Sequence, residues 1–318
     1  MKIGIIGGAG YTAGELLRIL LHHPQAEIEF VHSNSNAGKP VFSVHQDLIG
    51  ETDLVFTDTI SQAIDVLFLC VGHGEAVKFL EKNTIGSHIK IIDLSQDHRI
   101  AKLDWVYGLP ELNKPAIQKS RYIANPGCFA TCIELALLPL AKAHLLLNEI
   151  HISGTTGSTG AGQKPTDTTH FSWRNNNLSV YKAFEHQHLA EITQGIKQLQ
   201  PDFQHDINFI PYRGNFTRGI LVTAYTQFNG TLEEAKEIYK TYYENEPFVI
   251  LTDENPDLKQ VVNTNKCVIY LEKHKNKLMI ISLIDNLTKG ASGQAVQNMN
   301  LLFGLPEIEG LMLKPSAF

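Results

Sequence analysis

Cysteine is scarce in this chain: 318 residues include four, namely Cys70, Cys128, Cys132 and Cys267. Their spacing matches neither a disulfide framework nor a usual zinc-binding pattern. We therefore expect a reducing, cytoplasmic compartment and no metal site. Each thiol has to be judged by its own surroundings, because a free cysteine is commonly a small buried residue and only in special places a nucleophile.

Long apolar runs and an excess of positive charge are also missing. No run approaches membrane-spanning length, and the N-terminus leads straight into a glycine-rich turn, so we expect neither a membrane segment nor a signal peptide. Lys and Arg number 27 against 33 Asp and Glu, a net charge of −6. This balance argues against nucleic acid or an anionic membrane as a partner. With 43% hydrophobic residues, the chain is long enough for two soluble domains.

The N-terminal pattern predicts a strand over 2–6, a glycine-rich turn over 7–14, a helix over 15–21 and a strand over 26–32. This order is typical of the βαβ unit that opens a dinucleotide-binding fold. Glycine in such a turn lets backbone N–H groups approach a pyrophosphate at the helix N-terminus. The alternative is a tight turn without a ligand. The predicted cofactor contacts in this turn are Gly7, Gly10, Tyr11, Thr12 and Ala13.

An acidic residue is absent after the second predicted strand, where an NAD site usually has one for the ribose 2′-hydroxyl. The segment instead offers hydroxyls, amides and a cation, with Ser33 and Lys39 as the predicted contacts. These groups suit a 2′-phosphate and favour NADP, although a polar surface loop would look the same. Gly72 follows another buried strand and is predicted to line the cofactor crevice.

The tetrapeptide Asn125-Pro126-Gly127-Cys128 precedes an apolar run of helical spacing. Cys128 therefore lies at or just before a helix N-terminus. Unpaired N–H groups and the helix dipole favour an anion there, and a thiolate is the nucleophilic form of cysteine. A buried cysteine beside an ordinary turn is the alternative. Cys70, within an apolar strand, and Cys132, one helical turn beyond Cys128, fit packing better.

A second candidate group begins a helix predicted from about Tyr181 to Ile192 and contains His186 and His188. Residues two apart do not share a helix face, but in a turn or at a helix start both can point into a cleft. A histidine beside a cysteine can raise its thiolate content and transfer a proton. The competing interpretations are structural histidines and a zinc site. The zinc site lacks further ligands of workable spacing.

After about residue 148 the composition changes to a loop of small hydroxylic residues over 153–164, followed by alternating strands. Arg213 and Arg218 lie beside glycine turns, where guanidinium groups suit a carboxylate or phosphate. Solvated turn arginines are the alternative. We therefore divide the chain into a cofactor-binding domain, residues 1–148 and 286–318, and a second domain, residues 149–285, which contains the histidines and arginines that could bind substrate.

Taken together, seven segments make the chain resemble the N-acetyl-γ-glutamyl-phosphate reductase family over nearly its whole length. They are Gly7–Leu16, Ile92–Ser95, Tyr107–Glu111, Asn125–Thr131, His186–Ile192, Gly214–Gly219 and Lys289–Asn298. The resemblance implies an α/β fold with a Rossmann-type domain and an inserted α+β catalytic domain, akin to aspartate-semialdehyde dehydrogenase. It implies NADPH, Cys128 as nucleophile and both histidines in the site.

The same resemblance implies that a small acyl-phosphate substrate is reduced through a thioester, in a homo-oligomer that is a dimer or tetramer. Ser158, Gly160 and Asn286 are the further expected cofactor contacts, and Asn125, Lys164 and Arg218 the expected substrate contacts. Gln163 stands where the family commonly has Arg. An N-succinyl or aminoadipate-type substrate and a non-catalytic NADP-binding regulator are the alternatives.

Overall fold

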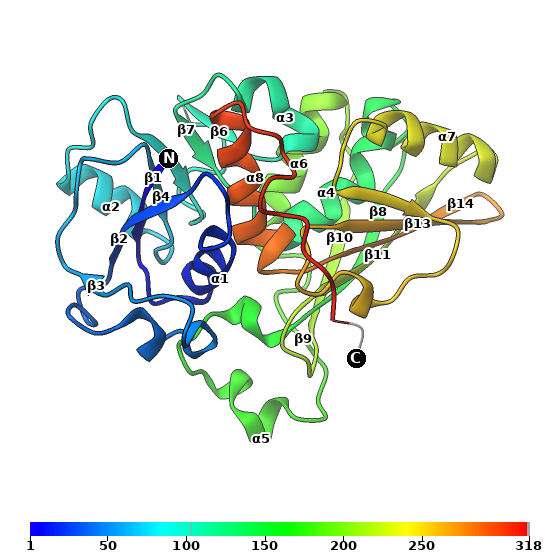
Figure 1. Ribbon diagram of the computed structural model, residues 1–318. Helices are drawn as coiled ribbons and strands as arrows, with labels where there is room; N and C mark the ends of the chain where they lie inside the picture. Colours follow the sequence, from blue (N-terminus) through cyan, green and yellow to red (C-terminus); the bar gives the residue numbers. More distant parts are fainter. Residues whose placement is uncertain (103, 317–318) are drawn as a thin grey trace. The chain divides into compact units, whose positions relative to one another are not determined.

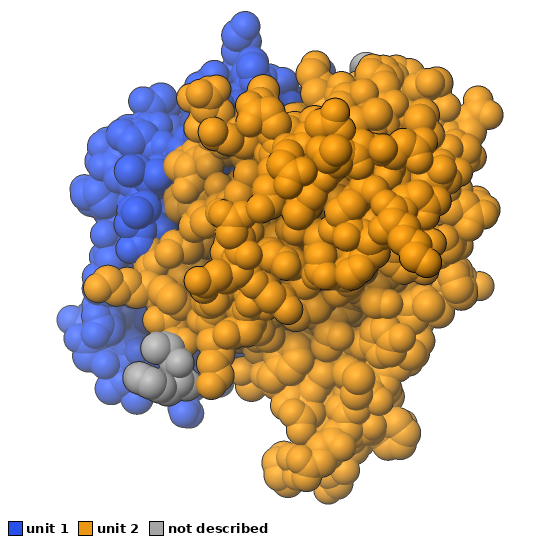
Figure 2. Space-filling view, turned by 90° about the vertical axis from the view of Figure 1, so that its right-hand side faces the viewer, with its two compact units in different colours: residues 1–126, 291–312 blue, residues 127–290, 313–318 orange. Residues whose placement is uncertain are grey.

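The computed structural model describes residues 1–102 and 104–316. The chain divides into two compact units, coloured blue and orange in Figure 2. Unit 1 comprises residues 1–126 and 291–312, and unit 2 comprises 127–290 and 313–318. Each unit contains one seven-stranded sheet. The chain thus leaves the first unit at residue 126, returns to it at residue 291 and ends in the second unit.

The sheet of unit 1 is parallel throughout and has the order β3-β2-β1-β4-β5-β7-β6. Its first five strands follow the order of a doubly wound dinucleotide-binding sheet. The strands are β1 (Lys2–Ile6), β2 (Glu27–His32), β3 (Phe56–Thr57), β4 (Val66–Leu69), β5 (Lys90–Asp93), β6 (Trp105–Tyr107) and β7 (Tyr122–Ala124), and the helices are α1 (Tyr11–Leu20), α2 (Glu75–Lys82), α3 (Pro110–Ile117) and α8 (Gly293–Leu302). Every residue of β4 is buried, as expected for a strand covered on both faces.

The turn between β1 and α1 requires glycine for steric reasons. Gly7 has φ +78°, and a Cβ on it would lie 2.5 Å from the Cys70 carbonyl oxygen. A Cβ on Gly8 would lie 2.3 Å from the Val31 side chain. The His45 ring touches Gly14, and its Nε2 lies 2.7 Å from the Gly8 carbonyl oxygen. The turn is therefore held in a shape that exposes backbone N–H groups at the start of α1.

The sheet of unit 2 is mixed and has the order β12-β13-β14-β11-β8-β10-β9. Its strands are β8 (Ile150–Thr156), β9 (Ser179–Val180), β10 (Ile207–Arg213), β11 (Ile220–Gln227), β12 (Val249–Thr252), β13 (Cys267–His274) and β14 (Lys277–Ile284), and its helices are α4 (Cys128–Lys142), α5 (Phe171–Arg174), α6 (Leu189–Leu199) and α7 (Leu232–Tyr243). Strands β13 and β14 pair antiparallel as a hairpin whose turn contains Lys275.

Helix α4 is buried on nearly all sides, because it packs on β11 and β14 and against α6 and α7 (Figure 1). Pro139 lies inside this helix and has no N–H for the carbonyl of Leu135, four residues earlier. The Tyr243 hydroxyl of α7 donates to that carbonyl at 2.5 Å. The Tyr239 hydroxyl donates to the neighbouring Ala136 carbonyl at 2.5 Å. The Tyr243 hydroxyl thus takes the place of the N–H that Pro139 lacks, and Tyr239 adds a bond to the next carbonyl.

The contacts divide the chain at residues 126/127 and 290/291, and the domain bounds at 148/149 and 285/286 stay a prediction. The first division by contacts lies before α4. The reason is that α4, although it follows β7 directly, buries its apolar surface against the strands of unit 2. In addition, α6 begins at Leu189, so His186 and His188 lie in the turn before the helix.

The tyrosine contacts at Pro139 generate a stability prediction. Tyr243→Phe removes the hydroxyl that serves the Leu135 carbonyl and leaves that buried acceptor without its partner. We expect a loss of about 1–3 kcal/mol in the free energy of unfolding, measured by urea denaturation. Tyr225→Phe, on an exposed ring of β11, is the matched control and should change little. Equal stability of the Tyr243 variant and the wild type would contradict the repair role.

Candidate active site

Cys128 is the first residue of α4, and Gly127 is its N-cap with extended backbone (φ −72°, ψ 151°). The Gly127 carbonyl accepts the Thr131 N–H at 2.8 Å, so the helix is hydrogen-bonded from its first turn. The N–H groups of that turn have no acceptor within the helix and form a place suited to an anion. The predicted position of Cys128 at a helix N-terminus is confirmed, which is where a thiolate is favoured.

The other three cysteines are buried. Burial raises the pKa of the Cys70 thiol to about 12. Burial also raises the pKa of Cys132 well above its ordinary value, and its Sγ lies 3.3 Å from the Ser282 carbonyl oxygen. Cys267 packs against the same serine. Cys128 is only partly buried and is the one cysteine placed to react.

His186 is buried in a cluster of rings, with its edge or face toward Phe129, Tyr181 and Phe209. Its Nδ1 accepts the backbone N–H of His188 at 3.2 Å, so the proton of the neutral ring is on Nε2. Burial, followed by the charges of His188 and Lys182, lowers the pKa of His186 to about 3. At neutral pH this residue is therefore an uncharged hydrogen-bond donor.

His188 is also buried, and its ring centroid lies 4.6 Å from that of His186. Its Nε2 is 3.9 Å from Oε1 of Glu191, three residues later on α6. The other carboxylate oxygen of Glu191 accepts the Gly127 N–H at 2.8 Å. The carboxylate of Glu191 therefore lies between the His188 ring and the N-cap of α4.

A positive charge, that of Arg213, lies next to the same ring cluster. The Arg213 guanidinium lies 4.6 Å from the centroid of the Tyr181 ring. Its buried Nε has no hydrogen-bond partner, and within residues 1–102 and 104–316 no carboxylate pairs with it. Burial and the charge of Cys128 raise the pKa of Tyr181 to about 12, so its hydroxyl stays protonated. The Arg213 charge, together with burial, lowers the pKa of Arg174.

The space beside the Cys128 backbone is filled by Gly290. A Cβ on that glycine would lie 2.8 Å from the Cβ of Cys128. Gly290 belongs to the single π-helical turn Thr288–Ser292, and its N–H donates to the Asp285 carbonyl at 2.9 Å. Only a residue without a side chain therefore fits next to Cys128.

Three predicted site residues have their polar groups engaged within the protein. Arg218 pairs with buried Asp285 through its Nε and Nη2 at 3.0 Å each. The Asn286 amide accepts the Gly219 N–H at 2.6 Å and donates to Thr159 at 3.0 Å. The Asn125 amide, in unit 1, donates to the Ala291 carbonyl and accepts from Asn298. These contacts hold loops in place and leave less of each side chain for a ligand.

The remaining predicted contacts lie on loops. Lys164 is exposed in the segment after the 3-10 turn Ser158–Ala161, which contains Ser158 and Gly160. In unit 1, Ser33 and Lys39 belong to the turn after β2, where Asn36 bonds to both side chains at 3.2 and 3.5 Å. Gly72 lies in the loop between β4 and α2 with open space around it. Tyr11, Thr12 and Ala13 form the first turn of α1.

The glycine turn fits the dinucleotide that the sequence predicts. Side chains at Gly7, Gly8 and Gly14 are excluded sterically, and the extended backbone of Gly10 leads the chain into α1. The first N–H groups of α1 are therefore accessible for a pyrophosphate. No acidic residue follows β2 before Lys39, which leaves hydroxyl, amide and ammonium groups for a 2′-phosphate.

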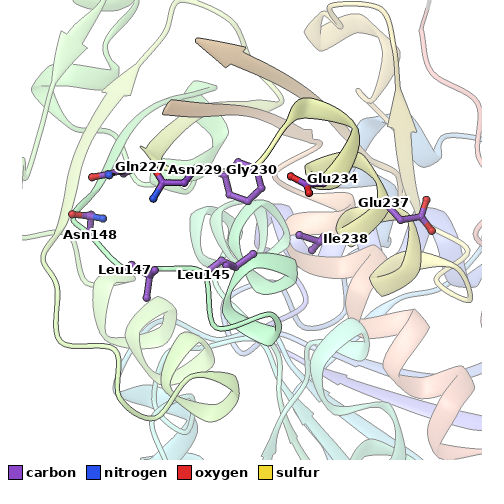
Figure 3. A pocket seen from close by; sticks show the side chains of 10 residues that line it. Leu145, Leu147, Asn148, Gln227, Asn229, Gly230, Glu234, Glu237 and Ile238 are labelled. Atoms are coloured by element: carbon purple, nitrogen blue, oxygen red, sulfur yellow. Dashed lines mark hydrogen bonds between the residues drawn. The ribbon is translucent and has the colours of Figure 1, made fainter. Parts of the chain in front are cut away.

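An apolar cavity of about 490 Å³ lies elsewhere in unit 2. Figure 3 shows Glu234, Glu237 and Ile238 of α7 on one side of it and Leu145 and Leu147 after α4 on another. It is at the opposite end of α4 from Cys128, and no cysteine, histidine or cation lines it. The cavity therefore offers no group for the chemistry of the candidate site.

Two searches of the described residues bear on other kinds of site. Within residues 1–102 and 104–316, no group of three or more His, Cys, Asp or Glu side chains is placed to hold a metal ion. In the same part of the chain, no helix is long and apolar enough to cross a membrane.

Sequence reasoning assigned no role to Glu191, Tyr181 or His45. The spacing of Glu191 from His188, three residues on a helix, is a signal that could have drawn attention to that pair. Tyr181 reaches the site through a loop that positions it beside His186 and Arg213. No local pattern marks His45, because its contact is with a turn more than thirty residues earlier.

Two family descriptions match the chain. Residues 2–120 match "Semialdehyde dehydrogenase, NAD binding domain". Residues 128–286 match "Semialdehyde dehydrogenase, dimerisation domain". The two matches follow the division into units closely, with Cys128 as the first residue of the second match.

Curated relatives match over the full length of both chains. The chain is 61% identical to the N-acetyl-gamma-glutamyl-phosphate reductase of Parabacteroides distasonis over 322 residues. It is 58% identical to the protein of the same name from Flavobacterium johnsoniae over 324 residues. In both comparisons the match covers 100% of each chain.

Solved structures show the same fold at low sequence identity. Aspartate semialdehyde dehydrogenase II of Vibrio cholerae superposes with a TM-score of 0.76 at 17% identity, covering 95% of this chain and 98% of that one. The Candida albicans aspartate semialdehyde dehydrogenase solved with NADP gives a TM-score of 0.73 at 15% identity, with the same coverage. With this fold, a cysteine at the start of α4 and full-length relatives of one name, the chain belongs to the N-acetyl-γ-glutamyl-phosphate reductase family of the semialdehyde dehydrogenases.

Proposed function

We propose that this chain reduces N-acetyl-γ-glutamyl phosphate to N-acetylglutamate γ-semialdehyde with release of phosphate, a step of arginine biosynthesis. The observation that carries the proposal is the position of Cys128 at the start of α4, in one unit with His188, Glu191 and Arg213. The family name supports the substrate, and the full-length match to relatives of that name supports the reaction.

The first chemical step belongs to Cys128. His188 takes the thiol proton, and the thiolate attacks the acyl carbon, forms a thioester and expels phosphate. NADPH, when bound at the glycine turn of unit 1, supplies the hydride that reduces the acyl group. As the thiohemiacetal collapses to the aldehyde, His188 returns its proton to the leaving sulfur.

Negative charge develops on the acyl oxygen during these steps. The neutral His186 has an Nε2–H donor, and the first N–H groups of α4 are a second set of donors. Both are fixed before substrate binds, so they stabilise the oxyanion without reorganising. Asn125, which was expected to help, has its amide engaged by Ala291 and Asn298.

We assign the binding of the substrate's anionic group to Arg213 rather than to Arg218. Arg213 lies over Tyr181 without a carboxylate partner among the described residues, whereas Arg218 is paired with Asp285. A guanidinium binds a carboxylate or phosphate in bidentate fashion. Lys164 stays a second candidate for the same anion.

The chain is further proposed to act as a homo-oligomer, either dimer or tetramer, in the cytoplasm. The description of residues 128–286 as a dimerisation domain supports assembly. The four free cysteines support a reducing compartment.

The function is tested most directly in the oxidative direction. Purified protein should reduce NADP when given N-acetylglutamate semialdehyde and phosphate, and Cys128→Ser should lower this rate at least about 10³-fold because the thioester cannot form. Retained binding of NADPH by the variant, measured by fluorescence titration, shows that the fold is intact. Wild-type turnover in Cys128→Ser would rule out the covalent route. Preference for the N-succinyl analogue would reassign the acyl group.

The pH dependence of kcat distinguishes the proposed roles of His186 and His188. The pKa of His186, lowered to about 3, keeps that residue neutral above pH 5. His188→Gln should therefore abolish the acid limb of the profile between pH 5 and 8 and lower kcat by about 10²–10⁴-fold. His186→Gln should lower kcat but keep the limb. The reverse pattern would exchange their roles.

Steady-state kinetics and stability measurements distinguish the proposed roles of Arg213 and Arg218. Arg213→Lys should raise the KM for the acyl phosphate by about 10–100-fold, since a point charge replaces a bidentate contact. The KM for NADPH should not change. Arg218→Lys should mainly lower stability, because it weakens the pair with buried Asp285. A substrate KM altered only by the Arg218 change would overturn this assignment.

A further inference from the structure

His45 is a buried histidine, 6% exposed, that lies against the glycine turn of unit 1. Its Nε2 is 2.7 Å from the Gly8 carbonyl oxygen. A carbonyl can only accept, so the ring carries a proton on Nε2 and donates it to Gly8. The Nδ1 side of the same ring faces α1, because a Cβ on Gly14 would lie 2.5 Å from that atom. One imidazole therefore contacts both the turn and the first turn of the helix that follows it.

The hydrogen bond to Gly8 fixes the plane of the peptide group between Gly8 and Ala9. The described residues contain no cis peptide bond, and in a trans peptide the carbonyl and the N–H point in opposite directions. The Ala9 N–H therefore points away from the His45 ring. Within residues 1–102 and 104–316, no backbone carbonyl accepts this N–H. It is a donor in the turn where a pyrophosphate is expected.

His45 also belongs to the chain segment that follows the predicted 2′-phosphate loop, residues 33–39. The Lys39 carbonyl at the end of that loop accepts the N–H of Phe56 on β3 at 2.9 Å. The Phe56 ring lies beside the glycine turn, since a Cβ on Gly8 would be 3.3 Å from it. Its centroid is 6.3 Å from that of the His45 ring. The loop and the glycine turn are thus connected through two side chains.

We propose that His45 is a positioning residue of the cofactor site, which orients the Gly8–Ala9 peptide so that its N–H serves the cofactor pyrophosphate. The ring also sets the requirement for glycine at position 14. This inference rests on cofactor binding at the glycine turn, which is part of the proposed function, and it does not depend on the roles of Cys128, His186 or His188. The competing explanation is a buried histidine that only stabilises unit 1.

Three variants distinguish these explanations. His45→Leu removes the donor and keeps a side chain of similar size. His45→Gln keeps an N–H donor near the position of Nε2. His23→Leu is the matched control, because His23 is also buried, at 3% exposure, and its Nε2 lies 3.0 Å from Oδ1 of Asn300. His23 follows the C-terminal end of α1, whereas the glycine turn precedes the N-terminal end.

Binding of NADPH, measured by fluorescence titration without substrate, is the first readout. His45→Leu should raise the Kd about 10–30-fold, since one N–H donor loses its alignment, and His45→Gln should stay within about threefold of the wild type. The KM for NADPH should rise with the Kd, while kcat stays within about twofold. His23→Leu should lower the melting temperature but leave the Kd unchanged. Equal Kd values for His45→Leu and the wild type, or equal losses in His45→Leu and His23→Leu, would refute the positioning role.

A comparison of NADPH with NADH tests whether His45 acts through the Ala9 peptide. Both cofactors carry the pyrophosphate, and only NADPH carries the 2′-phosphate. His45→Leu should therefore raise both Kd values by the same factor. A loss confined to NADPH would mean that His45 acts through residues 33–39, and it would overturn the assignment to the peptide.

Gly14→Ala tests the steric contact in the protein without cofactor. In the wild type the new Cβ displaces the His45 ring, so the melting temperature should fall and the Kd for NADPH should rise. In a His45→Ala background the same change should raise the melting temperature by about 2–4 °C, because alanine favours a helix more than glycine does. This reversal of sign is the expected coupling. The same effect of Gly14→Ala in both backgrounds would contradict the contact.

The outcomes separate this inference from the proposed function. If the wild type oxidises N-acetylglutamate semialdehyde but His45→Leu binds NADPH as tightly as the wild type, the function stands and the inference is wrong. If His45→Leu loses affinity for NADPH but the wild type does not act on that substrate, the inference stands and the function is wrong. If His45→Leu does not fold, Gly14→Ala decides: wild-type affinity for NADPH in that variant overturns the inference, and weakened affinity supports it.

Discussion

The structure depends above all on the burial of α4. This helix begins at Cys128 and is apolar along almost its whole length, so it has to be enclosed by β11, β14, α6 and α7. Enclosure fixes the helix axis, and the axis fixes the direction in which its first N–H groups point. The anion-binding capacity at Cys128 is therefore a consequence of hydrophobic packing far from the chemistry, and no flexible loop has to order itself to create it.

His186 and His188 lie side by side in the candidate site, with ring centroids 4.6 Å apart. The ring cluster around His186 buries that imidazole and lowers its pKa, while His188 lies next to the carboxylate of Glu191. Two chemically identical side chains, two residues apart, thus have different surroundings, which is the basis of the different tasks proposed for them. Arg213 adds a positive charge over the Tyr181 ring, and among the described residues no carboxylate pairs with it.

Much of this arrangement could be predicted from the sequence because it rests on local rules. The turn before α1 is rich in glycine, and the tetrapeptide before α4 contains Pro and Gly. These residue types are typical of such turns, so both turns could be recognised from the sequence. Contacts between distant residues could not be predicted. Arg218 was expected to face substrate, but Asp285, 67 residues later, accepts its guanidinium. Glu191 lies 64 residues from Gly127, and nothing local indicates that bond. Composition changes after α4, near residue 148, whereas the compact units divide the chain before this helix, because α4 packs within unit 2.

Pro139 and Tyr243 form a pair whose substitutions cannot be independent. With proline present, the Leu135 carbonyl needs the tyrosine hydroxyl; with any other residue there, a backbone N–H would compete with the hydroxyl for the same oxygen. A lineage that replaced Pro139 first would leave the buried Tyr243 hydroxyl without its acceptor. A lineage that lost the Tyr243 hydroxyl first would leave the Leu135 carbonyl without a donor. Either order of change passes through a less stable intermediate, so the two positions are coupled by epistasis along the back of the helix that presents the nucleophile.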